Sequence, residues 1–153
     1  MSKLDDRLTE LGLDIPELAK PAGTYIPAVI SGNLVFTSGQ LPFVAGALPA
    51  TGKVGAEVTA EAAKGYAATC VLNALAAAKS AIGSLDRVTR VVKVVGFVAS
   101  DPSFTAQPGV INGASDLLGQ IFGDAGVHAR SAVGVAVLPL DSPVEVELIL
   151  EFA

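Results

Sequence analysis

The stretch HARSAVGVAVLPLDSPVEVELILEF (128–152) closes the chain and carries a strong β-strand signal. Two runs rich in Val, Leu and Ile, 129–138 and 143–152, flank a short loop that begins with a proline. This pattern predicts two strands joined as a hairpin. The hairpin is very apolar, yet Arg130 lies at the start of its first strand and Glu145 lies early in its second.

Arg130 is placed on a strand face that has room beside it. Side chains alternate along a strand, so Arg130 shares its face with Ala132, Gly134 and Ala136. Small neighbours leave space for a planar partner that a guanidinium can bind through two hydrogen bonds, such as a carboxylate. The first strand is therefore predicted to line a pocket on this face.

The hairpin pairing separates the two charges. It places Glu145 opposite about Val137, on the order of 23 Å along the strand from Arg130. Two interpretations follow. Either the two charges are unrelated and keep an exposed strand soluble, or a second subunit brings one charge near the other. Glu147 and Glu151 share the face of Glu145, which favours a solvated face.

The rest of the chain supplies three more strands and two long helices. Residues 25–39 predict a hairpin with its turn near 31–33, and 87–100 predict a buried strand. An apolar face from Ala63 to Ile82 predicts a helix between the N-cap Thr59 and Gly83, and 108–122 predict a second helix. Residues 1–20 predict a short helix, and 41–57 a loop.

The element order β-β-α-β-α-β-β indicates an α+β domain with two layers, in which the helices cover one face of a mostly antiparallel sheet. The other sheet face is then left apolar, and self-association is the simplest way to cover it. We expect residues 1–22 to form an N-terminal extension and 23–153 a single domain.

Composition excludes several classes of function. A net charge of −5 argues against a nucleic-acid partner, and no apolar run reaches the length of a membrane span. The single cysteine, Cys70, cannot form an internal disulfide and fits a reducing cytoplasm. Its place on the apolar face of a helix indicates a small buried residue, although a Cys–His pair with His128 stays an alternative.

The closing stretch resembles the C-terminal signature of the RidA (YjgF/YER057c/UK114) family, formerly named endoribonuclease L-PSP. The matching positions are Ala129, Arg130, Leu138-Pro139 and Val144-Glu145. Two further matches are FTSGQLP (36–42), which is similar to a Thr-Ser-Gly-Gln segment of the family, and Tyr25 in a Gly-x-Tyr element. Asn112 lies near the family's helix asparagine.

The resemblance implies a chorismate-mutase-like fold, with sheets that form a central barrel in a homotrimer and ligand sites in the clefts between subunits. It implies hydrolysis of reactive enamines and imines, such as 2-aminoacrylate, to 2-keto acids and ammonia without a metal or organic cofactor. Arg130 would bind the substrate carboxylate and Glu145 would activate or position water. The resemblance further implies substrate contacts at Tyr25, Ser38, Gly39, Asn112 and Ala132.

Some positions depart from the family pattern and leave other functions open. Ala132 stands where cysteine is frequent, and His128 stands where proline or alanine is frequent. With the N-terminal extension, these changes indicate a divergent branch. The alternatives are a trimer that binds or senses a carboxylate without catalysis, an enzyme acting on another carbonyl or imine metabolite, and a ribonuclease, which so acidic a chain disfavours.

Overall fold

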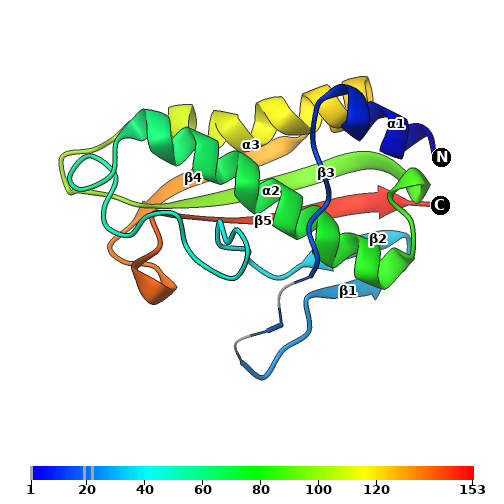
Figure 1. Cartoon of the computed structure of the whole chain (residues 1–153), viewed down its shortest axis with the longest axis horizontal. Coiled ribbons are helices and arrows are strands. Elements are labelled where there is room, and N and C mark those ends of the chain that lie inside the picture. The colour runs from blue at the N-terminus through cyan, green and yellow to red at the C-terminus, as the bar shows by residue number, and fades with distance from the viewer. Residues whose placement is uncertain (1, 19, 22) are drawn as a thin grey trace.

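The computed structural model describes residues 2–18, 20–21 and 23–153, and it places five strands in one mixed sheet. The strand order is β1-β2-β5-β3-β4, and β4 and β1 lie at the two edges (Figure 1). The strands are β1 (Ala28–Ser31), β2 (Leu34–Thr37), β3 (Val88–Ala99), β4 (Ala129–Val135) and β5 (Val144–Phe152). The predicted α+β class and element order are confirmed.

The predicted C-terminal hairpin is wrong. Both strands exist close to their predicted bounds, but β3 lies between them: β4 pairs with it in parallel and β5 pairs with it antiparallel. Helix α3 (Gln107–Phe122) connects β3 to β4, and a crossover helix is the usual way to bring two consecutive strands into parallel pairing. Glu145 consequently lies opposite Phe97 of β3, and not opposite Val137.

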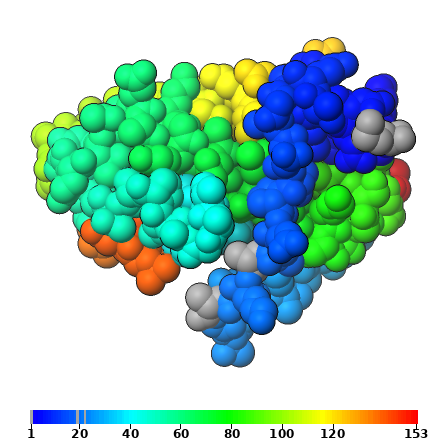
Figure 2. All heavy atoms as spheres, viewed as in Figure 1, coloured from blue at the N-terminus to red at the C-terminus, as the bar shows by residue number. Residues whose placement is uncertain are grey.

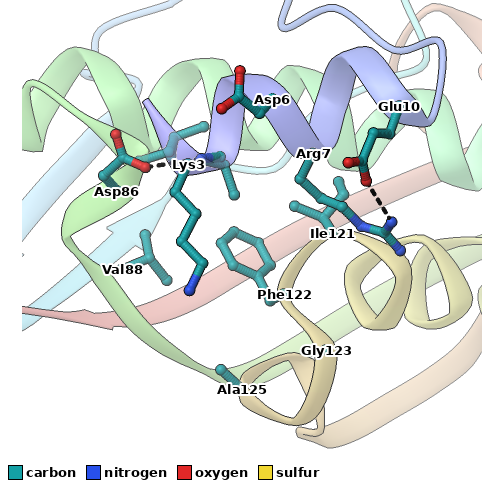
Figure 3. A pocket seen from close by; sticks show the side chains of 12 residues that line it. Lys3, Asp6, Arg7, Glu10, Asp86, Val88, Ile121, Phe122, Gly123 and Ala125 are labelled. Atoms are coloured by element: carbon teal, nitrogen blue, oxygen red, sulfur yellow. Dashed lines mark hydrogen bonds and ion pairs between the residues drawn. The ribbon is translucent and has the colours of Figure 1, made fainter. Parts of the chain in front are cut away.

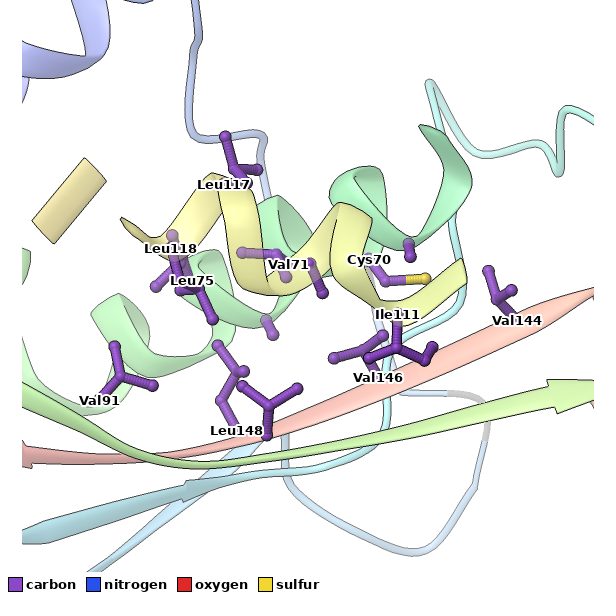
Figure 4. Close-up of a cluster of buried hydrophobic side chains, with 14 of the residues drawn as sticks. Cys70, Val71, Leu75, Val91, Ile111, Leu117, Leu118, Val144, Val146 and Leu148 are labelled. Carbon is purple, nitrogen blue, oxygen red and sulfur yellow. The ribbon is translucent and has the colours of Figure 1, made fainter. Parts of the chain in front are cut away.

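Helices α2 (Ala60–Ile82) and α3 pack together on one face of the sheet. The Thr59 side chain caps α2 by accepting a hydrogen bond from the Ala62 amide, and Gly83 ends the helix with a φ of 87°. All predicted apolar positions of α2 are buried except Tyr66, which is partly buried against the core. The core between helices and sheet is aliphatic and includes Cys70, Val71, Leu75, Ile111, Leu118 and Leu148 (Figure 4).

Two glycines allow the layers to approach closely. A Cβ on Gly113 of α3 would lie 1.9 Å from the carbonyl oxygen of Lys64 in α2, and a Cβ on Gly96 of β3 would lie 2.5 Å from the end of the Ile111 side chain. Neither position has room for a larger residue without movement of a helix. These contacts hold α3 at a fixed place above β3 and β4.

The N-terminal segment packs on this domain. Helix α1 (Lys3–Glu10) is shorter than predicted, because the chain turns at Gly12 with a φ of 67°; positions 1 and 19 of the predicted 1–20 helix lie outside the described residues. Leu8 is buried, and the Arg7 Nε donates a 2.8 Å hydrogen bond to the carbonyl of Gln120 at the end of α3. Figure 2 shows the segment lying over the body of the protein. The boundary at residue 22 between an N-terminal extension and the domain stays a prediction.

The second face of the sheet carries exposed apolar side chains. Strand register places Val29, Phe36 and Ile149 on this face at one end and Phe97 and Val133 toward the other edge. Val29 and Val133 are 52% and 44% exposed. Within the described residues, neither α2 nor any other helix has the length and apolarity required to cross a membrane.

Candidate functional site

Arg130 projects toward the helices, where α3 presents polar groups to it. Its partner across the parallel pairing is the fully buried Val94, and paired residues point to the same side of a sheet. The Arg130 Nη1 donates to the Asn112 Oδ1 at 2.7 Å and to the Ser115 Oγ at 3.2 Å. The Ser115 Oγ also lies 2.8 Å from the Nε2 of His128. We call Asn112, Ser115, His128 and Arg130 the arginine cluster.

The guanidinium of Arg130 is held by neutral oxygens. Besides the two Nη1 bonds, its Nη2 donates to the Pro108 carbonyl at 3.4 Å. In the part of the chain that the structure describes, no carboxylate forms an ion pair with it, and no bond from its Nε is found. The edge formed by Nε and Nη2 therefore retains donors in the geometry that a carboxylate accepts.

Glu145 lies on the other side of the sheet. It pairs with Phe97 on β3, one residue from the fully buried Val144 and Val146, which point to the helices. Its side chain packs against Gly39, where a Cβ would lie 2.8 Å from the Glu145 Cδ. The Ser38 hydroxyl next to it donates a 2.7 Å hydrogen bond to the Ile26 carbonyl. We call Ser38, Gly39 and Glu145 the glutamate cluster.

Burial changes the acidity of two side chains in this region. Partial burial raises the pKa of the Glu145 carboxyl above its ordinary value, and the neighbouring Glu147 carboxylate raises it further. Burial also raises the pKa of the Cys70 thiol well above its ordinary value. Cys70 is completely buried in the core, so the interpretation as a small buried residue is confirmed.

The predicted site residues do not meet within one chain. Asn112 joins Arg130, and Ala132 lies on the same face of β4 as Arg130, whereas Ser38 and Gly39 join Glu145 on the opposite face. Tyr25 is half exposed and precedes Ile26, whose carbonyl accepts from Ser38. The separation estimated from the hairpin no longer applies, but the two charged groups are still divided by the sheet.

A hollow of about 590 Å³ lies elsewhere, between α1, the end of α3 and the start of β3. Figure 3 shows the Lys3 side chain extending into it between Val88 and Phe122. None of the predicted site residues lines this hollow. Among the described residues, no group of three His, Cys, Asp or Glu side chains is arranged to hold a metal ion.

Ser115 is a member of the arginine cluster that the sequence did not predict. A serine inside a helix gives no signal of its own. The spacing of Asn112 and Ser115 places both on one helix face, and His128 and Arg130 point to one face of β4. The parallel pairing of β4 with β3, which was not predicted from the sequence, places β4 beneath α3 and brings these two pairs together.

Comparisons with known proteins agree with this architecture. Residues 5–152 match the family model "YjgF/chorismate_mutase-like, putative endoribonuclease". Protein TCP17 of Trypanosoma cruzi is 46% identical over 147 residues, covering 94% of this chain and 91% of TCP17. The crystal structure of protein Atu1372 from Agrobacterium tumefaciens, of unknown function, superposes with a TM-score of 0.91 at 45% identity, covering 98% of this chain and 92% of that one.

A more distant structure contains a bound amino acid. It is that of TdcF from E. coli with bound serine, which is 26% identical and has a TM-score of 0.59, with 91% of this chain and 94% of TdcF covered. The match of the family model to nearly the whole chain is the decisive finding. The protein belongs to the YjgF/chorismate mutase-like family.

Proposed function

We propose that this protein hydrolyses reactive enamines and imines of the 2-aminoacrylate type to 2-keto acids and ammonia. The observation that carries this proposal is the state of Arg130. Its guanidinium is oriented by neutral acceptors on α3, has no carboxylate partner in the described chain, and keeps the Nε–Nη2 edge for a ligand. A substrate carboxylate would supply both the missing charge and two acceptors.

Glu145 is suited to act on water. A carboxyl whose pKa is raised is a stronger base when ionised than an ordinary glutamate, and a pKa nearer the working pH favours general base catalysis. An enamine such as 2-aminoacrylate would first gain a proton from solvent at its methylene carbon and so become the protonated imine. Glu145 would take a proton from water as the oxygen adds to the imine carbon, and would return it to the nitrogen. Breaking of the C–N bond, with loss of the hydroxyl proton to solvent, then releases ammonia and leaves the keto acid. A protonated imine is already electrophilic, so positioning of water is sufficient and no cofactor is required.

The remaining predicted site residues are assigned supporting roles. Asn112 would orient Arg130, whereas Tyr25, Ser38 and the backbone of Gly39 and Ala132 would contact substrate or water. Serine bound to TdcF provides a precedent in the family's fold for a small amino acid as ligand.

The active unit is proposed to be a homotrimer with the site between subunits. The two clusters lie on opposite faces of the sheet, β4 is an edge strand, and Val29 and Val133 expose apolar surface on the face without helices. A neighbouring copy placed on this face would cover that surface and bring its own cluster to the other subunit's edge. We place the protein in the cytoplasm, where its single thiol would stay reduced.

Self-association is tested with Val133→Lys. We expect the charge on the sheet face to lower the mass measured by light scattering from that of a trimer to that of a monomer. The matched control is Val44→Lys, an equally apolar position that is 59% exposed in the 41–57 loop. A trimer that survives Val133→Lys with a normal unfolding temperature would contradict the proposed interface.

The activity is tested by measuring ammonia and keto-acid release from freshly generated 2-aminoacrylate and from imines of several amino acids. Wild type and Arg130→Ala are compared after their masses in solution have been shown to agree. Turnover by wild type that is lost in Arg130→Ala is the expected result. A folded wild-type trimer that hydrolyses no imine would overturn the deaminase proposal and leave a carboxylate-binding protein as the alternative.

A further inference from the structure

His128, Ser115 and Arg130 form a chain of hydrogen bonds that begins at a backbone carbonyl. The His128 Nδ1 lies 2.6 Å from the Gly126 carbonyl oxygen, and its Nε2 lies 2.8 Å from the Ser115 Oγ. The same oxygen accepts from the Arg130 Nη1 at 3.2 Å. His128 thus reaches the guanidinium through a single hydroxyl group.

With the His128 ring neutral, this series of hydrogen bonds has one consistent direction. A carbonyl oxygen can only accept, so the His128 Nδ1 carries a hydrogen. In the neutral ring the Nε2 is then an acceptor, and the Ser115 hydroxyl donates to it. That donation turns the remaining lone pairs of the Ser115 Oγ away from His128 and leaves them to accept from Arg130. Every donor and acceptor along the chain is matched.

Backbone geometry fixes both ends of this chain. His128 precedes β4 and Arg130 is its second residue, so both side chains meet the face of α3 that carries Asn112 and Ser115. Gly126 is buried, and a Cβ there would lie 2.4 Å from the Leu118 carbonyl of α3. The carbonyl that anchors His128 therefore belongs to a segment packed directly on the same helix.

We infer that His128 is a positioning residue: through the Ser115 hydroxyl it holds the Arg130 guanidinium in the orientation that presents its Nε–Nη2 edge to the substrate carboxylate. This inference rests on the proposed function and adds a residue to its site. Without Ser115, the guanidinium would be held by the Asn112 Oδ1 on one hydrogen of Nη1 and by the long 3.4 Å bond from Nη2 to the Pro108 carbonyl. Acceptance of both Nη1 hydrogens, by Asn112 and Ser115, fixes the guanidinium plane more tightly.

The test uses two readouts on the full-length protein. The first is the ¹⁵N–¹H spectrum of arginine guanidinium groups, in which Arg130→Lys identifies the Arg130 signals. We expect wild type to show separate, slowly exchanging Nη signals for Arg130, and Ser115→Ala and His128→Phe to lose this separation. The second readout is pyruvate binding by calorimetry, together with KM and kcat for 2-aminoacrylate.

We expect both variants to weaken pyruvate binding and to raise KM about fivefold, the loss typical of one hydrogen bond, with kcat nearly unchanged. Ser115→Thr keeps the hydroxyl, and His128→Gln keeps an acceptor near the Nε2 position; both should recover most of the loss. A merely structural role would not produce this recovery together with a change confined to KM.

Each other outcome contradicts the inference in a recognisable way. Unchanged Arg130 signals in His128→Phe would show that the chain does not orient the guanidinium. Loss of the separate Arg130 Nη signals with unchanged pyruvate affinity and KM would show that the orientation of the guanidinium does not affect ligand binding. A folded wild type that neither turns over an imine nor binds pyruvate would overturn the proposed function itself, and the positioning role with it.

Discussion

The arginine cluster and the glutamate cluster hold opposite charges by different physical means. Arg130 is surrounded by oriented neutral acceptors, which satisfy three of its hydrogens and leave its charge without a partner among the described residues. Glu145 lies beside Gly39 with partial burial and a like charge nearby, so its ionised form is less favoured than that of an exposed glutamate. The first arrangement suits binding of an anion, and the second suits transfer of a proton.

The largest effect is expected from the arginine cluster. Arg130→Ala should lower kcat/KM about 1000-fold, because two charge-assisted hydrogen bonds to the substrate are lost. Arg130→Lys should lower it only about 30-fold, because an ammonium keeps the charge but lacks the planar pair of donors. Steady-state kinetics with 2-aminoacrylate measures both. Equal losses of kcat/KM in the two variants would mean that the planar pair of donors binds the substrate and that the positive charge alone contributes little.

Glu145→Gln should affect the other kinetic parameter. We expect kcat to fall about 100-fold while pyruvate affinity stays near that of wild type, because the amide cannot accept a proton from water. In wild type, kcat should fall as the pH drops through the raised pKa of Glu145, since only the ionised form is a base. That acid limb should be absent in the variant. An unchanged acid limb would assign the proton transfer to another group.

Gly39→Ala tests the position of the Glu145 carboxylate, and its expected effect on kcat is smaller. The new Cβ would contact the far end of the Glu145 side chain, which can move aside at little cost in stability. Displacement of the carboxylate should lower kcat about tenfold with KM unchanged, because catalysis depends on its position. Gly119→Ala is the control, since no atom lies within 4 Å of a Cβ there. An unchanged kcat in Gly39→Ala would contradict a role of Glu145 in the reaction.

The smallest expected effect is on stability. The raised pKa of Glu145 means that the folded state binds its proton more tightly than the unfolded state. Ionisation of Glu145 therefore destabilises the fold increasingly as the pH rises from the ordinary glutamate pKa through the raised one. Glu145→Gln should raise the unfolding temperature at pH 7 by less than about 3 °C, since the group is partly screened by solvent. The gain should disappear near pH 4, and a gain independent of pH would contradict this origin.

Local signals in the sequence were sufficient for the elements but not for their pairing. Thr59 and Gly83 mark the ends of α2, and the alternation along β4 places Arg130 and Ala132 on one face, as the pairing with β3 does. The short loop after Leu138 looked like a hairpin turn, and nothing in it indicates that β3 lies between the strands it joins. That arrangement depends on the crossover through α3, which is a contact between distant parts of the chain.

The same limit applies to the site. Arg130 and Glu145 stood out because charges are rare in apolar strands, whereas Ser115 became visible only once α3 was placed over β4. Neither the sequence nor one folded chain joins the two clusters. We propose that assembly of subunits joins them in one functional site.

Mixing two inactive variants tests this claim most directly. Arg130→Ala and Glu145→Gln subunits are unfolded together in equal amounts, refolded, and assayed on 2-aminoacrylate. If each site takes its arginine from one subunit and its glutamate from a neighbour, about a quarter of the sites contain both native residues, and about a quarter of the wild-type activity returns. If one chain supplied both residues, every site would lack one of them, and activity no higher than that of the separate variants would contradict the account.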